Sequence, residues 1–192
     1  MTARYRQALR AQVRGLWTGV LSEGQFANGM FTAVDGGLTR AWNAGLKDVG
    51  ILPGEQTPEE LAEMFRLILA EVGRIPGLSA HVSRNSKANG GKLFPLFDRV
   101  ELWVNRMLDI RNRAKVMAGA NKKLQWRIDP AKDNCSTCLK LNNKVKRASA
   151  WEKSGIKPQN PPNPDLECEG WRCGCSWHVT DLPLSKGPLP RR

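Results

Sequence analysis

Apolar residues recur every three or four positions through much of the first 117 residues of the chain. This spacing places them along one side of an α-helix. It predicts helices over residues 4–21, 26–46, 58–72 and 93–117. The stretch 73–92 is loop-like, with room for a short helix after Pro76. Four helices packed as a bundle account for this part of the chain most economically.

The third predicted helix has the clearest start. Thr57 is a good N-cap residue, and Pro58 suits the first helical position. Glu59 and Glu60 follow, where acidic side chains face the positive end of the helix dipole. One side of this helix is predicted to carry the apolar residues Leu61, Met64, Phe65, Ile68 and Val72.

The character of the sequence changes after residue 121. The runs KLQWRI at 123–128 and KVKRA at 144–148 favour strands or irregular segments, and the proline-rich run at 155–165 favours neither helix nor strand. The expected fold class is mainly α: a helical domain over residues 1–121 and a cysteine-rich, zinc-stabilised α+β or irregular module over 122–182. A flexible basic tail is expected over 183–192. So small a module needs a bound metal in addition to apolar burial.

All five cysteines lie in this module, between positions 135 and 175. Cys135 and Cys138 form a CxxC pair, whose two sulfur atoms can reach one ion from a tight turn. The pattern favours a structural zinc site in which Cys168 and Cys173 complete the tetrahedral set. Cys175 is the leading substitute for one of them.

Other interpretations of the cysteines stay open. His178 follows them closely and is a weaker candidate for a zinc ligand. The thiols could also be buried without a metal, or serve a redox or disulfide role. The first twenty residues contain four arginines and no continuous apolar core, so we expect neither a signal peptide nor a membrane span and place the chain in the cytoplasm. Cysteines there are more often reduced and metal-binding than joined in disulfides.

The sequence contains no recognisable catalytic motif. It has no glycine-rich phosphate loop followed by Lys and Ser or Thr, no GxSxG motif, and no zinc-deaminase pattern. An all-cysteine set also closes a zinc site, so we expect a protein that is not an enzyme. Four tryptophans are expected to form the core of the module, with stacking on nucleic-acid bases as a minority interpretation; they are Trp126, Trp151, Trp171 and Trp177.

The charge of the chain is strongly positive. It has 30 Lys and Arg residues against 18 Asp and Glu, a formal net charge of +12, which suits a nucleic acid or an acidic protein partner. Ten of these bases lie between residues 122 and 158, beside three acids. The residues expected to contact the phosphates of double-stranded DNA are Lys140, Lys144, Lys146, Arg147, Lys153 and Lys157.

The last third of the chain, roughly residues 122–180, resembles the C-terminal cysteine region of phage head morphogenesis or minor head proteins. This family is typified by the F protein of phage Mu. Cys135 and Cys138 match its first cysteine pair, and the run Cys173-Gly174-Cys175 matches its terminal C-x-C. Cys168 stands near the place where many members have His. The His-Pro-Asn that leads into the terminal motif in the family is absent here.

The resemblance implies a structural protein of a phage head. Such a protein is present in several copies per particle, inside the capsid or at the portal vertex, after assembly in the host cytoplasm. Its partners are the portal or major capsid protein and packaged DNA, which it contacts without sequence preference, and it involves no membrane. Two alternatives stay open from the residues: a zinc-containing DNA-binding regulator, and a metal-dependent nuclease.

Overall fold

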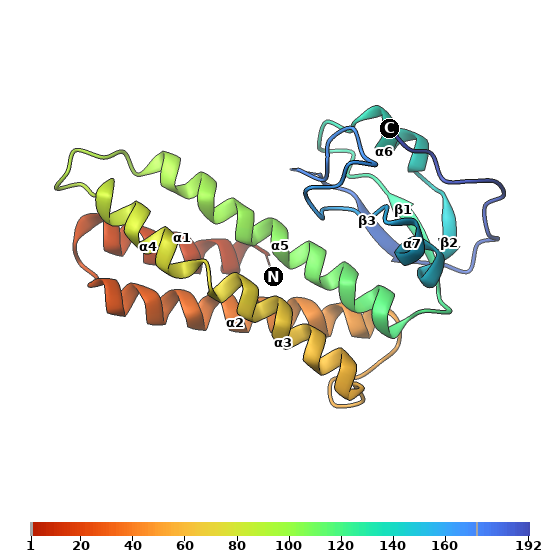
Figure 1. Cartoon of the computed structure of the whole chain (residues 1–192), viewed down its shortest axis with the longest axis horizontal. Helices are drawn as coiled ribbons and strands as arrows, with labels where there is room; N and C mark the ends of the chain where they lie inside the picture. Colours follow the sequence, from red (N-terminus) through yellow and green to blue (C-terminus); the bar gives the residue numbers. More distant parts are fainter. Residues whose placement is uncertain (1, 172) are drawn as a thin grey trace. The chain divides into compact units, whose positions relative to one another are not determined.

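The computed structural model describes residues 2–171 and 173–192. Helices dominate it, with a small three-stranded sheet in the C-terminal region, and this confirms the expected mainly α fold class. The four long predicted helices are present, as is the short helix near Pro76. The elements in chain order are α1 (Thr2–Thr18), α2 (Glu23–Asp48), α3 (Pro58–Val72), α4 (Ile75–Arg84), α5 (Phe94–Ala118), β1 (Lys123–Arg127), α6 (Ser136–Leu141), β2 (Val145–Arg147), α7 (Ala148–Ser154) and β3 (Ser176–Val179) (Figure 1).

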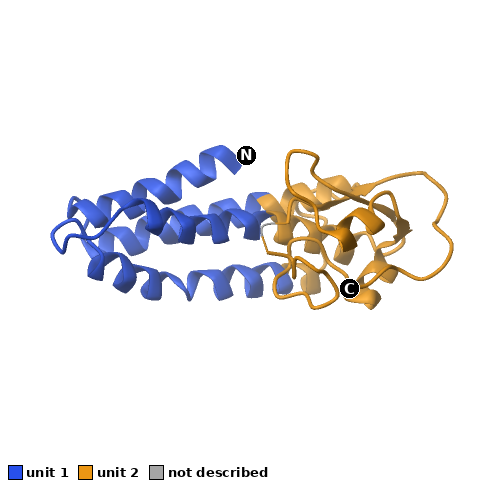
Figure 2. Cartoon of the chain, turned by 90° about the horizontal axis from the view of Figure 1, so that it is seen from above, with its two compact units in different colours: residues 1–40, 62–107 blue, residues 41–61, 108–192 orange. Residues whose placement is uncertain are grey.

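The chain divides into two compact units (Figure 2). Unit 1 contains residues 1–40 and 62–107, and unit 2 contains residues 41–61 and 108–192. The division runs through α2, α3 and α5, whereas we expected a boundary between residues 121 and 122. The division into a helical domain over residues 1–121 and a module over 122–182 therefore stays a prediction. Within the described residues, no helix combines the length and the apolar character needed to cross a membrane.

Unit 1 is a bundle of helices around an apolar core. Tyr5 and Leu9 on α1 and Met30 on α2 are almost fully buried, as the helical spacing predicts. The Tyr5 ring lies against Gly37 on α2, where a Cβ atom would collide with the ring. The bundle core therefore depends on a glycine in the middle of a helix as well as on the apolar pattern.

The start of α3 is as predicted, but its apolar side is not fully buried. The Glu60 N–H donates to Thr57 Oγ1 at 3.2 Å, and the Thr57 N–H donates to the Glu60 carboxylate at 3.0 Å, which is a capping box. Met64 and Ile68 are buried, but Leu61 is 36% and Phe65 is 54% exposed. The predicted apolar side of α3 is therefore only partly covered, and Leu61 and Phe65 lie on its exposed part.

Unit 2 contains an antiparallel sheet with strand order β2-β1-β3. Leu124 on β1 pairs with Lys146 on β2 and with Val179 on β3. The strands β1 and β2 arise from the two runs that favoured strands. The third strand was not predicted, because its four residues form too short a run to show an alternating pattern.

Three tryptophans form the core beside this sheet. Trp126, Trp151 and Trp177 are 0–1% exposed, and their ring centroids lie 5.7–6.4 Å apart. The Trp151 indole N–H donates to the Leu124 carbonyl oxygen at 2.9 Å. Trp171 is 49% exposed, so the prediction that it joins the core was wrong. It lies between Cys168 and Cys173 in the chain, outside the tryptophan core.

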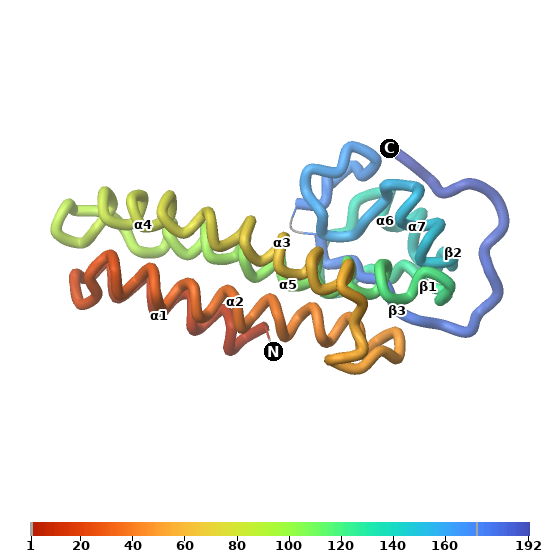
Figure 3. Tube along the Cα trace, turned by 60° about the horizontal axis from the view of Figure 1, so that its bottom comes forward, coloured from red at the N-terminus to blue at the C-terminus, as the bar shows by residue number. Residues whose placement is uncertain are grey.

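The last ten residues follow the surface of unit 2 (Figure 3). The Ser185 N–H donates to the Val145 carbonyl oxygen at 2.9 Å, and Lys146 Nζ donates to the carbonyl oxygens of Ser185 and Gly187 at 2.8 Å each. Arg191 forms an ion pair with Asp165 at 2.7 Å. The segment that we expected to be a flexible basic tail thus has defined hydrogen-bond partners in the structure.

Candidate metal centre

The CxxC pair is positioned by the start of α6. Cys135 is the N-cap residue of this helix, and its sulfur accepts a hydrogen bond from the Cys138 N–H at 3.4 Å. This bond directs the first sulfur back over the helix start, on the same side as the second. Cys138 is 1% exposed, whereas Cys135 is partly exposed. The start of this short helix thereby places the sulfur atoms of Cys135 and Cys138 next to each other.

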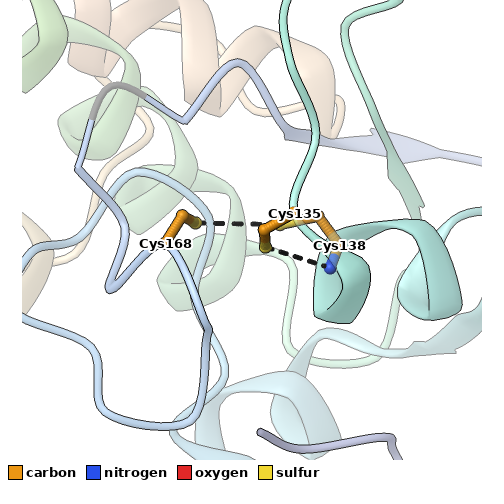
Figure 4. Close-up of side chains that lie close together, drawn as sticks. All are labelled: Cys135, Cys138 and Cys168. Atoms are coloured by element: carbon orange, nitrogen blue, oxygen red, sulfur yellow. Dashed lines mark hydrogen bonds between the residues drawn. The ribbon is translucent and has the colours of Figure 1, made fainter.

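The fold brings all five thiols into two overlapping groups. The first contains Cys135, Cys138 and Cys168, and the second contains Cys138, Cys173 and Cys175. Within each group all sulfur atoms lie within 4.8 Å of one another. Figure 4 shows the first group, in which the sulfurs of Cys138 and Cys168 are 4.0 Å apart. Cys138 belongs to both groups and is therefore the centre of the cluster.

These separations suit a tetrahedral metal ion. Zinc–sulfur bonds of about 2.3 Å at tetrahedral angles place the ligand sulfurs about 3.8 Å apart. The sulfurs of each group would therefore move by about 1 Å or less to reach that geometry. The cluster can therefore hold a metal ion.

The terminal C-x-C pair precedes β3. The Cys175 N–H donates to the Cys173 sulfur at 3.4 Å, which closes a tight turn. Gly174 lies between them, and a Cβ atom there would come within 2.6 Å of the Asp129 Cβ. Glycine at this position therefore lets the turn approach the loop that leads to α6. Both cysteines are buried.

Cys168 is held near α6 by its neighbour in the chain. The Glu167 carboxylate accepts hydrogen bonds from the Ser136 N–H at 2.9 Å and from the Ser136 hydroxyl at 2.6 Å. These two bonds keep the pKa of Glu167 below its usual value. The Glu167 N–H also donates to Thr137 Oγ1 at 3.4 Å. Glu167 lies 31 positions from Ser136 in the chain, so no local sequence signal indicates this positioning role.

The pKa values of the buried thiols are shifted in opposite directions. Hydrogen bonding to Cys168 and to the C-x-C pair, together with burial, raises the pKa of Cys138 far above its usual value. Hydrogen bonds from Cys138 and then from Cys173 lower the pKa of Cys175 to about 4, although burial opposes this, and the Trp126 indole contributes to the lowering. The pKa of Cys173 is lowered as well. The thiolate form is thus favoured at Cys173 and Cys175 beside the Cys138 thiol, and the thiolate is the form in which cysteine binds a metal ion.

The described structure does not single out four of the five cysteines. The predicted ligands Cys135, Cys138, Cys168 and Cys173 all lie in the cluster, and so does the alternative Cys175. His178 belongs to neither group. It lies on β3, is exposed, and its Nε2 is 2.9 Å from the Ser176 hydroxyl.

A buried cation anchors the strand that follows the cysteines. Lys115 on α5 is 5% exposed, and its Nζ donates to the Trp177 carbonyl oxygen at 2.6 Å and to the Asp48 carboxylate at 2.9 Å. Arg111 donates two further hydrogen bonds of 2.8 Å to the same carboxylate. Burial lowers the pKa of Lys115, and the Asp48 carboxylate opposes this shift. The hydrogen bond from Lys115 to the Trp177 carbonyl oxygen therefore fixes β3 to the last turns of α5.

The predicted DNA-contacting residues fall into two groups. Lys140 and Lys153 are exposed and Lys144 is partly exposed, and none of the three has an ion pair within the described part of the chain. The other three have structural partners. Lys146 donates to the Ser185 carbonyl oxygen in the C-terminal segment, Arg147 donates to the Asn121 carbonyl oxygen, and Lys157 forms an ion pair with Glu152 at 3.0 Å.

Comparison with protein-family models, with curated proteins and with solved structures found no match for this chain. What is established is therefore a mainly helical chain whose C-terminal region gathers five cysteines into a cluster that can hold a metal ion. The identity of the metal and the biological role are matters for proposal.

Proposed function

We propose that this chain is a minor head or head morphogenesis protein of a phage, a structural component in which zinc holds the C-terminal module together. The observation that carries the proposal is the convergence of the CxxC pair and the C-x-C pair at Cys138. These are the two motifs on which the resemblance to that family rests. The proposal places the protein at the portal vertex or capsid interior, in contact with the portal or major capsid protein.

The chemistry of the cluster supports a structural role for the metal. Catalytic zinc sites keep one coordination position open to water or substrate, and structural sites fill all four with protein ligands. Here five thiols compete for four positions, and three of them are buried: Cys138, Cys173 and Cys175. The nearby carboxylate of Glu167 already accepts two hydrogen bonds from Ser136. This arrangement supports a closed zinc site and a protein that is not an enzyme.

The free lysines support contact with packaged DNA. Lys140 on α6 and Lys153 on α7 extend from the elements that surround the cysteines, and Lys144 lies just before β2. With no ion pair to break, their ammonium groups can bind phosphates by releasing counterions. Such binding is independent of base sequence, which suits a protein that meets the whole genome.

The DNA contact can be tested by charge reversal at Lys140, Lys144 and Lys153 together. If all three bind phosphates, the slope of log affinity against log salt for a duplex DNA probe should flatten by up to about 3. Lys146, Arg147 and Lys157 are left intact in this variant, because their bonds hold the module.

A matched control reverses the three exposed lysines Lys47, Lys87 and Lys92. Each reversal changes the formal charge by two, so both variants fall from +12 to +6. Equal loss of affinity in the two variants would show that DNA responds only to net charge. That result would remove the assigned contact surface.

The biological role is tested by quantitative mass spectrometry of particles purified from the infected or prophage-induced host. A low, fixed copy number relative to the portal protein is the expected result. Absence from procapsids and mature particles would overturn the proposal and favour the zinc-containing DNA-binding regulator.

A further inference from the structure

Unit 1 carries an open groove between α1 and the start of α5. It consists of two cavities, of ≈ 410 and ≈ 480 Å³, which share Arg10 and Arg14 as lining residues. Both cavities are lined by residues of unit 1 alone. The other lining residues are Ala3, Arg6, Gln7 and Ala11 on α1, with Phe94, Pro95, Phe97 and Asp98 on α5.

The charges in this groove are only partly compensated. Arg6 and Arg10 each bind the Glu101 carboxylate at 2.9 Å. Arg14 has no carboxylate partner among the described residues, and its guanidinium carbon lies 6.0 Å from the centroid of the Phe97 ring. Phe94, at the rim, is 82% exposed. A partner bound in the groove could therefore supply a carboxylate to Arg14 and an apolar side chain to cover Phe94.

These requirements favour a protein segment over a nucleic acid. Glu101 holds two of the three arginines, and Asp98 adds a second negative charge to the groove. The phosphates of a nucleic acid in this groove would lie next to both carboxylates, which repel them. Nucleic-acid affinity depends instead on cations that have no carboxylate partner. Aromatic and arginine side chains around an apolar floor are typical of the centres of protein interfaces.

The same chain displays a surface with the complementary features. Leu61, Phe65 and Leu69 follow one another at four-residue spacing along α3 and are 36%, 54% and 65% exposed. Glu59 is exposed in the first turn of this helix, and Glu55 is exposed just before it. The stretch 48–65 contains five acidic residues and no Lys or Arg, in a chain with a net charge of +12. We call Leu61, Phe65 and Leu69 the α3 stripe.

We propose that the groove of one copy of this chain binds the α3 stripe of a second copy. Phe65 and Leu69 pack against Phe94, and the acidic start of α3 supplies the carboxylate for Arg14. Burial of three large apolar side chains drives the contact, and the ion pair sets its direction. Because groove and stripe are different surfaces, the contact is heterologous, so each copy can offer both. This inference depends neither on the metal nor on a role in a phage head.

Two variants of the full chain separate the surfaces. The groove variant carries Arg14→Glu and Phe94→Ala, and the stripe variant carries Phe65→Ser and Leu69→Ser. All four side chains are exposed, so the fold should persist, and circular dichroism checks this. The mass in solution is then measured by light scattering after size exclusion, at several protein concentrations.

The proposal predicts that the wild-type chain associates as its concentration rises and that each variant alone stays a single chain. An equimolar mixture of the two variants should form a 1:1 complex, because one supplies an intact stripe and the other an intact groove. Three results would each overturn the proposal. These are a single-chain mass for the wild type up to about 100 µM, where even a weak contact would show, variants that associate as the wild type does, or a mixture that remains two separate chains. In the first case the groove serves another occupant, such as a different acidic protein or DNA.

Discussion

Substitution of Cys138 by Ser should abolish the stabilisation of the chain by zinc. Cys138 is the one thiol common to both sulfur groups, so neither group survives its loss. Each of the four other cysteines belongs to a single group, and its substitution leaves the other group complete. The structure therefore ranks Cys138 above its neighbours as a metal ligand, although a count of thiols would rank all five equally.

The size of the effect follows from binding linkage. At a free zinc concentration about 1,000 times the dissociation constant, the bound ion adds about 4 kcal/mol to the free energy of unfolding. For a chain of this length that corresponds to a rise in Tm of roughly 8–16 °C. The wild type should show this rise on addition of zinc, whereas Cys138→Ser should show little or none. Without zinc the two proteins should differ far less.

The assay is thermal unfolding followed by near-ultraviolet circular dichroism, which reports on the packed tryptophans beside the cluster. Cys175→Ser is the matched control, because it keeps the predicted ligands Cys135, Cys138, Cys168 and Cys173. It should retain most of the zinc-dependent rise. If Cys138→Ser responds to zinc as fully as the wild type, the cluster does not bind metal as described.

Three further predictions concern the ion pair at Asp48, the contact between α2 and α5, and His178. Asp48→Asn should destabilise the chain by about 2–4 kcal/mol in urea unfolding, because it leaves the buried Lys115 ammonium without a counter-charge. The double variant with Lys115→Met should recover most of this loss, and equal stability of the single and double variants would contradict the reasoning. Burial raises the pKa of Asp48, but hydrogen bonds from Arg111 and Lys115 outweigh this effect, so the pKa of the folded state is lowered. The stabilisation is therefore present above the unfolded pKa near 4 and is lost as the pH falls through the lower folded value. This loss should be missing from the acid-unfolding profile of Asp48→Asn. Gly45→Ala should lower Tm, because the new methyl group would meet the Arg111 carbonyl oxygen and separate α2 from α5, and an unchanged Tm would show that the helices can move apart at no cost. His178→Ala should leave the bound metal unchanged, and loss of metal in this variant would place His178 among the ligands.

Much of the fold could be predicted because its signals are local. Helical spacing located the long helices, and Thr57 as N-cap, Pro58 and the two acids after it marked the start of α3. Exposure could not be predicted in the same way. Phe65 and Trp171 are apolar in the sequence, but whether such residues are covered depends on which elements pack beside them.

The candidate site shows the same division. The spacings of Cys135 with Cys138 and of Cys173 with Cys175 predicted a cluster, because short spacings hold sulfurs together whatever the surrounding fold. The supporting groups could not be predicted, since they come from distant positions. Glu167 reaches Ser136 across 31 residues, and Lys115 reaches the Trp177 carbonyl across 62.

The most direct test of the metal centre is native mass spectrometry of the purified chain combined with elemental analysis. The account predicts one zinc ion per chain, released when the thiols are alkylated, with the metal absent from Cys138→Ser. A chain that purifies from zinc-supplemented medium without metal, and takes up none when zinc is added to its reduced form, would contradict it.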